Sequence, residues 1–314
     1  MIINPNTGLP VVSFTEMASD ATAFRSLMAR SRHPVVPGGP LDVALSVIEG
    51  LPSYAATSPD PAENVVREAF PQAIGLDYLA RLLNQVSAFP GFAALIPHLR
   101  YVATAGSASA LTAAASASQP RHHVFELLVA ALGLKAGYTS TLAEPDVVLT
   151  RSSSWAIACK SINTDNPVTL ADRVEEGIGQ CLKSDADYFL GAVSVSNRLP
   201  HEPFLPLLDS VTGTWGSFRN ATVPAELLRG AVTFITSALQ AEAASRFLHG
   251  REARGFRGVL VLAQTVAAIE GKGACLTMPA LVSRASLFGE PGLADMPEEL
   301  LGRDLHWAAQ AVLS

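Results

Sequence analysis

The spacing of apolar residues predicts a mainly helical first part of the chain. Residues 1–60 are rich in Pro, Gly and Ser, so we expect only short helical pieces there. Between residues 62 and 101 apolar residues recur at helical spacing, and Pro90 and Pro97 break the pattern. An Ala- and Ser-rich stretch at 103–119 follows, and we take it as a domain boundary. The first predicted domain is therefore a helical N-terminal region, 1–120.

From residue 121 to residue 314 helices and strands alternate, and we treat this part as a second domain. The segment Arg151–Ser154 is a short polar turn between two apolar runs, which predicts a hairpin. A later helix opens with Thr169-x-x-Asp172, the spacing of a capping box. A strand, a helix and a strand in succession require a crossover, so the predicted fold class is α/β, with a mixed sheet flanked by helices. The predicted elements are helices at 123–135, 169–184 and 224–248 and strands at 145–150, 155–160, 188–194 and 258–263.

Composition narrows the classes of function. With 314 residues, 49% of them hydrophobic, the chain is long and apolar enough to bury a large core. A net charge of −6 argues against a protein that coats nucleic acid, which needs a basic excess, but not against an enzyme whose carboxylates hold metal ions. Its three cysteines form no CxxC pair, which argues against a disulfide framework and a zinc site. Without a signal peptide or a long apolar run, we expect a cytoplasmic protein that does not enter the membrane.

Candidate chemistry begins at the predicted hairpin. Side chains alternate across a strand, so Asp146 shares a face with its strand's even-numbered residues, and Ala158 shares a face with Lys160. A turn centred on Ser153 would place Asp146 opposite Lys160 and beside Ala158. A carboxylate and an ammonium are thus predicted to meet on one face, next to a small side chain that leaves room.

Two further polar residues are candidates for the same site. Glu126 is the only charged residue between His123 and Lys135, in an otherwise apolar helix. A carboxylate in such surroundings is costly unless it is paired or binds a cation. Gln180 lies on the helix after the hairpin, from which it could reach the same end of the sheet.

Together these residues resemble the PD-(D/E)XK superfamily of nucleases, and the resemblance covers roughly a quarter of the chain. It implies a restriction-endonuclease-like core, a mixed sheet with a helix on either side. The matching motifs are Phe125-Glu126-Leu127, Glu144-Pro145-Asp146, Ile157-Ala158-Cys159-Lys160 and a later helix with Gln180.

The resemblance also implies chemistry, which is hydrolysis of DNA phosphodiesters with Mg²⁺ or Mn²⁺ in restriction, defence or repair. Asp146, Glu126 and the backbone carbonyl of Cys159 would hold the ion. Lys160 would orient the attacking water, and Gln180 matches the Gln of the family. Because the cation and Lys160 favour its charged form, we expect Asp146 to be ionised at neutral pH. A homodimer would allow both DNA strands to be cut.

The chain departs from the family at Ala158, where the pattern has an acid, because Ala158 offers no oxygen to a hard cation. One explanation is a migrated acid, for which Glu175, Glu176 and Glu126 are candidates. A second is deliberate replacement of the acid. A third is a catalytically inactive protein of the same fold that binds nucleic acid or a protein partner. These explanations differ in what occupies the space beside Ala158. A carboxylate near Asp146 favours the enzyme, and a pocket closed by apolar side chains favours the inactive protein.

Overall fold

The structure is a computed structural model that describes residues 2–3, 10–57, 65–105, 119–161, 166–194, 230, 233–242, 255–263, 266–269, 274–277, 281–285 and 297–313. The helices are α1 (Phe14–Arg30), α2 (Pro40–Thr57), α3 (Val65–Val86), α4 (Leu99–Ala105), α5 (Gln119–Lys135), α6 (Pro167–Cys181) and α9 (Pro297–Gln310), with 3-10 helices η1 (Pro90–Ala94) and η2 (Ile96–His98). The strands are β1 (Ile2–Ile3), β2 (Pro10–Ser13), β3 (Thr139–Ala143), β4 (Asp146–Thr150), β5 (Ser154–Ser161), β6 (Tyr188–Ser194), β7 (Phe256–Ala263), β8 (Val266–Ile269), β9 (Ala274–Thr277) and β10 (Leu281–Ala285).

The N-terminal helices are longer than the short pieces that we predicted. α1 has 17 residues and α2 has 18. Ser13 and Glu16 form a reciprocal capping box at the start of α1. Pro40 is the first residue of α2, where a missing N–H breaks no helical hydrogen bond, and Pro52 is accommodated inside the helix. The proline-based prediction was wrong here because tertiary packing overrides local propensity.

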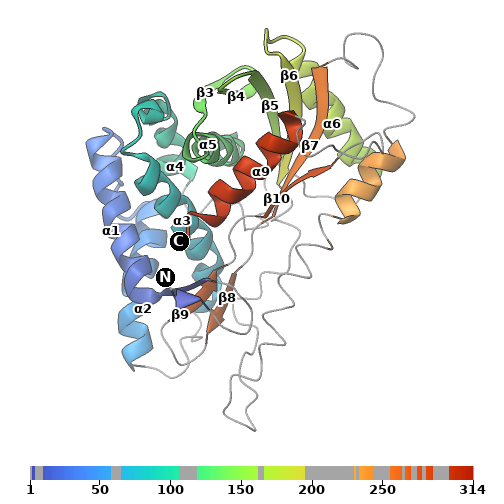
Figure 1. Cartoon of the computed structure of the whole chain (residues 1–314). Coiled ribbons are helices and arrows are strands. Elements are labelled where there is room, and N and C mark those ends of the chain that lie inside the picture. Colours follow the sequence, from blue (N-terminus) through green and yellow to red (C-terminus); the bar gives the residue numbers. More distant parts are fainter. Residues whose placement is uncertain are drawn as a thin grey trace.

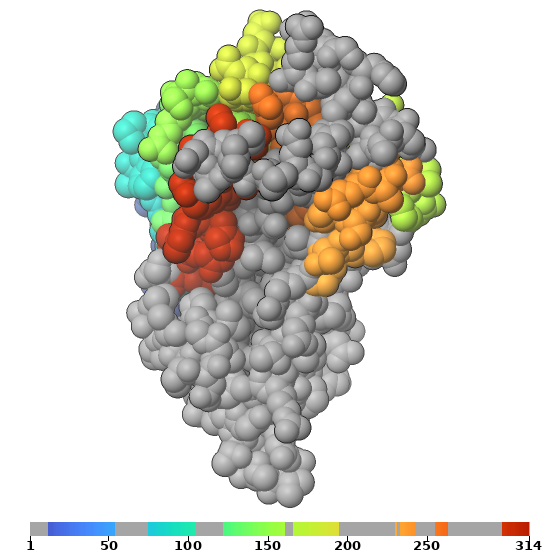
Figure 2. Space-filling model, turned by 45° about the vertical axis from the view of Figure 1, so that its right-hand side comes forward, coloured from blue at the N-terminus to red at the C-terminus, as the bar shows by residue number. Residues whose placement is uncertain are grey.

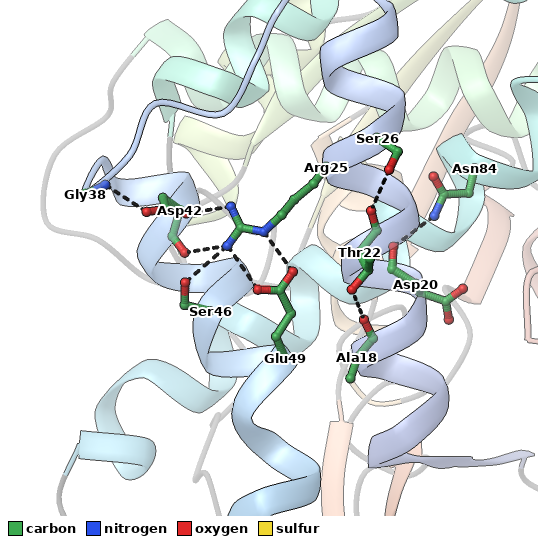
Figure 3. Close-up of polar contacts among 10 residues, drawn as sticks. All are labelled: Ala18, Asp20, Thr22, Arg25, Ser26, Gly38, Asp42, Ser46, Glu49 and Asn84. Atoms are coloured by element: carbon green, nitrogen blue, oxygen red, sulfur yellow. Dashed lines mark hydrogen bonds and ion pairs between the residues drawn. The ribbon is translucent and has the colours of Figure 1, made fainter.

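A polar network fastens α1 to α2 (Figure 3). Arg25 of α1 donates to the carboxylates of Asp42 and Glu49 and to the hydroxyl of Ser46, all on α2. Asp42 also accepts from the N–H of Gly38 at 2.7 Å, just before α2 begins. The guanidinium therefore has several partners at once, a geometry that suits Arg better than Lys.

The main sheet has six strands in the order β10-β7-β6-β5-β4-β3. β3, β4 and β5 are antiparallel neighbours, β5, β6 and β7 are parallel, and β10 is antiparallel to β7. The predicted hairpin is β4–β5, and α6 supplies the predicted crossover to β6. The α/β class with a mixed sheet flanked by helices is thereby confirmed. Figure 1 shows this sheet on one side of the molecule, helices α1 to α4 on the other and α5 between them.

Opposite faces of the sheet are covered by α5 and α6, because side chains alternate along the strands. Val147 and Ile157 belong to the core that includes α5. Ala156, Ala158 and Val193 belong to a second core that includes α6. Asn166 is the N-cap of α6, and its side chain accepts from the N–H of Val168, so the capping start predicted at Thr169 was wrong. Pro167 at the first helical position favours the earlier start.

One continuous core joins the N-terminal helices, α5, one face of the sheet and α9. Most of the predicted boundary, at 106–118, lies outside the described residues. Of the helix predicted at 224–248, residues 230 and 233–242 are described, and they are helical. Figure 2 shows α9 at the surface, with 233–242 on the same side of the molecule. None of the described helices combines the length and apolar character that crossing a membrane requires.

Candidate functional site

The hairpin register differs by two residues from our prediction. Val147 pairs with Ile157 and Thr150 with Ser154, so the turn is centred on Ser152, not Ser153. Continued by one residue, this register sets Asp146 opposite Ala158 instead of Lys160. A shift of two keeps every side chain on its predicted face, since the side-chain period is two.

Asp146 is the first residue of β4, one residue beyond Val147, where the pairing of β4 with β5 stops. Its Oδ2 accepts a hydrogen bond from the backbone N–H of Cys159 at 2.7 Å. Burial raises the pKa of Asp146 to about 7, the Cys159 bond and the Lys160 charge lower it, and the charges of Glu126 and Glu144 raise it. In the protein without a cation, burial therefore works against the charged form of Asp146 at neutral pH. The prediction that Asp146 is ionised supposes a bound cation, and it stays a prediction.

The backbone of Cys159 faces the same place. Within a strand, the N–H and C=O of one residue point toward the same neighbouring strand. The N–H of Cys159 bonds Asp146, so its carbonyl also faces the side on which the β4–β5 pairing has ended at Val147 and Ile157. That orientation is compatible with the predicted role of the Cys159 carbonyl as a metal ligand.

Glu126 is mostly buried, with 12% of its side chain exposed. Its Oε2 accepts from Nδ1 of His123 at 2.8 Å, a partner three residues earlier on α5. The Glu126 charge raises the pKa of Asp146 and opposes the burial that lowers the pKa of His122. The structure therefore brings both Glu126 and Lys160 within electrostatic range of Asp146.

Among the described residues, Ala158 is tightly covered by α6. The residue is 0% exposed and packs under α6. A Cβ added to Gly177 would lie 3.0 Å from the Ala158 Cβ and 3.7 Å from Cε of Lys160. Small residues at both positions let the helix approach the strand, and α6 occupies the volume that an acid at position 158 would need. Apolar side chains of α6 complete this closure.

Glu176 of α6 bonds Lys160. Nζ of Lys160 lies 3.4 Å from Oε1 of Glu176, and Nη1 of Arg173 donates to Oε2 at 2.9 Å. The Arg173 bond lowers the pKa of Glu176 more than burial raises it, and the Lys160 charge lowers it further. Glu175 is exposed. Among the three candidates for a migrated acid, Glu126 is the one whose charge acts on Asp146, and Glu176 instead restrains the lysine.

Gln180 lies on α6, one turn beyond Gly177. Its Oε1 is buried without a hydrogen-bond partner. The adjacent Cys181 Sγ is 3.5 Å from the Ala156 carbonyl oxygen, so this part of α6 lies further from Lys160 along β5 than Gly177 does. The catalytic role of Gln180 stays a prediction.

The donors that the site offers a metal are all oxygens, which suits Mg²⁺ or Mn²⁺. They are the carboxylates of Asp146 and Glu126 and the carbonyl of Cys159. Among the described residues no group of three or more His, Cys, Asp or Glu side chains could hold a metal ion. Two carboxylates are nevertheless compatible with Mg²⁺, which keeps several waters and binds substrate phosphates.

Two residues beside the site went unrecognised in the sequence. His123 bonds Glu126, and Tyr101 of α4 stacks on His123 with ring centroids 4.0 Å apart. The spacing of three between His123 and Glu126 was the one available signal, because such pairs meet on a helix. Comparison with protein-family models, curated proteins and solved structures gives no match for this chain. The resemblance to PD-(D/E)XK nucleases therefore stays a prediction from the motifs.

Proposed function

We propose that this chain is a Mg²⁺-dependent endonuclease that hydrolyses DNA phosphodiester bonds. The observation that carries the proposal is the environment of Asp146, a largely buried carboxylate held by the Cys159 N–H at 2.7 Å. Burial and the neighbouring Glu126 raise the pKa of Asp146 to about 7. The pKa is raised because the two carboxylates together have too little positive charge near them. A divalent cation would supply that positive charge.

The roles follow from the positions of the side chains. Asp146, Glu126 and the Cys159 carbonyl would hold the ion, which when bound supplies Lewis-acid activation of the phosphate and of a water. Lys160, whose side chain is 14% exposed, would orient the water and stabilise developing negative charge. To do so it must part from Glu176, and a bond of 3.4 Å to a half-exposed carboxylate is weak enough to allow this.

The proposal includes a restriction-endonuclease-like core. A helix on each face of a mixed sheet, α5 on one and α6 on the other, supports that part. It also includes DNA as the substrate, with restriction, defence or repair as its setting, and a homodimer that cuts both strands.

A second candidate function is favoured by the closure beside Ala158. Ala158 offers no side-chain oxygen and is fully covered by α6, so position 158 supplies no ligand to a metal ion. A protein of this fold that binds nucleic acid or a protein partner without cutting would retain the closure at no cost.

Cleavage of supercoiled plasmid with Mg²⁺ or Mn²⁺ tests the proposal. We expect the chain to convert plasmid to nicked or linear form, Asp146→Ala to lose this activity, and Asp185→Ala, at an exposed residue after α6, to keep it. If the chain and both variants shift DNA in a gel without cutting it, the second candidate replaces the nuclease.

A further inference from the structure

A stack of aromatic and cationic side chains lies beside the candidate site, at the beginning of α5. The Tyr101 and His123 rings are 4.0 Å apart at their centroids, with 24° between their planes. Cζ of Arg100 is 4.7 Å from the Tyr101 centroid, and its Nη2 donates to the Tyr101 hydroxyl at 2.8 Å. We call Arg100, Tyr101 and His123 the α4–α5 stack.

The α4–α5 stack connects directly to the candidate metal ligands. His123 bonds Glu126 at 2.8 Å, and the Glu126 charge acts on Asp146. A ligand that contacts the stack would therefore lie next to the place where we expect the scissile phosphate.

Attachment of α4 to the core does not require the stack. Leu99 and Val102 of α4 are 0% and 1% exposed, and they anchor the helix in the core. Arg100 is exposed, and among the described residues no carboxylate lies within ion-pair distance of it. An exposed guanidinium beside two polar rings is suited to a ligand that has a flat face and a negative charge.

We propose that the α4–α5 stack binds an unpaired nucleobase, so that the substrate is nucleic acid with a single-stranded segment beside the cleaved bond. This inference rests on the proposed function. Bases in a duplex are covered on both faces by their neighbours, whereas an unpaired base can stack on aromatic rings and on Arg planes. Since His123 covers one face of Tyr101, the base would take the place of the exposed Arg100 guanidinium over the other face or stack on that guanidinium. Arg100 would also neutralise a nearby phosphate.

The test measures oligonucleotide binding by the full chain in EDTA, where a metal-dependent nuclease does not cut. Anisotropy compares a single strand with its duplex, and 2-aminopurine fluorescence reports stacking. We expect the chain to prefer the single strand and to quench 2-aminopurine. Tyr101→Leu should weaken single-strand binding about tenfold and lose the quench, while Tyr101→Phe keeps both. Arg100→Gln should weaken binding, and Arg303→Gln, at an exposed residue of α9, should not.

The inference is overturned if the chain binds duplex as tightly as single strand, binds neither, or still quenches 2-aminopurine in Tyr101→Leu. Circular dichroism checks that this variant folds, and Arg100→Gln gives an independent result if it does not. Loss of the proposed function is a separate outcome: the chain then fails to cut plasmid with Mg²⁺ while the single-strand preference and the quench persist.

Discussion

Asp77 in α3 should make the protein less stable as the pH rises. Its side chain is 0% exposed, and neither carboxylate oxygen has a hydrogen-bond partner. The nearest cation, Nη2 of Arg81, is 4.0 Å away and lies 2.6 Å from Asp20 instead. Burial raises the pKa of Asp77 to about 7; Arg81 lowers it, and Asp20 and Glu16 raise it.

The sign and size of the effect follow from linkage. Below the ordinary value of 3.8, Asp77 is neutral in both the folded and the unfolded chain, so its ionisation takes nothing from the stability. Between 3.8 and about 7 the unfolded chain ionises while the folded protein keeps its proton, so stability falls with rising pH. At 1.36 kcal/mol for each pH unit, the full loss above the folded pKa is about 4 kcal/mol.

Urea unfolding of the parent and Asp77→Asn at pH 5 and pH 8 tests this reasoning. The free energy of unfolding of the variant, relative to the parent, should rise by about 3 kcal/mol between the two. Asp42→Asn is the matched control. The Gly38 N–H and Arg25 lower the pKa of Asp42, so the stabilisation by Asp42 is lost only below pH 3.8. The free energy of unfolding of Asp42→Asn, relative to the parent, should therefore be the same at pH 5 and pH 8. If the free energy of unfolding of Asp77→Asn, relative to the parent, is the same at pH 5 and pH 8, then Asp77 does not destabilise the folded protein by ionising.

Three substitutions test the packing and the ion pairs. Ala158→Glu should lower the free energy of unfolding by about 3 kcal/mol without raising plasmid cleavage, because α6 fills the space; strong cleavage by this variant would show that the closure argument is wrong. Glu176→Gln should change the cleavage rate by freeing Lys160, whereas the exposed neighbour variant Glu175→Gln should not; equal rates in both would remove Glu176 from the site. Arg25→Ala should cost about 2 kcal/mol in urea unfolding, since the α1–α2 network loses its centre; a loss within error of zero would contradict that role.

Local patterns were enough to predict the hairpin, β6 and the crossover helix. Alternation also put Asp146, Ala158 and Lys160 on one face, and this survived a wrong register because the error was an even number of residues. The register itself depends on whether the turn centres on Ser152 or Ser153, and a run of similar serines does not specify this.

Contacts between distant segments could not be predicted. The approach of Gly177 to Ala158 depends on how α6 docks on the sheet, and the stacking of Tyr101 on His123 depends on how α4 meets α5. Asp77 reads in the sequence as an ordinary solvated helix residue, and its burial follows only from the assembly of α3 with its neighbours.

The proposed nuclease requires Asp146 and Glu126 to hold a divalent cation together. Titration of the chain with Mn²⁺ at pH 8, followed by electron paramagnetic resonance, measures this binding directly, with Asp146→Asn, Glu126→Gln and the control Glu175→Gln alongside. We predict that the parent and the control bind Mn²⁺ alike and that both other variants bind it at least tenfold more weakly, about 1.4 kcal/mol. Equal Mn²⁺ binding by all four proteins, or none by the parent, would contradict the account.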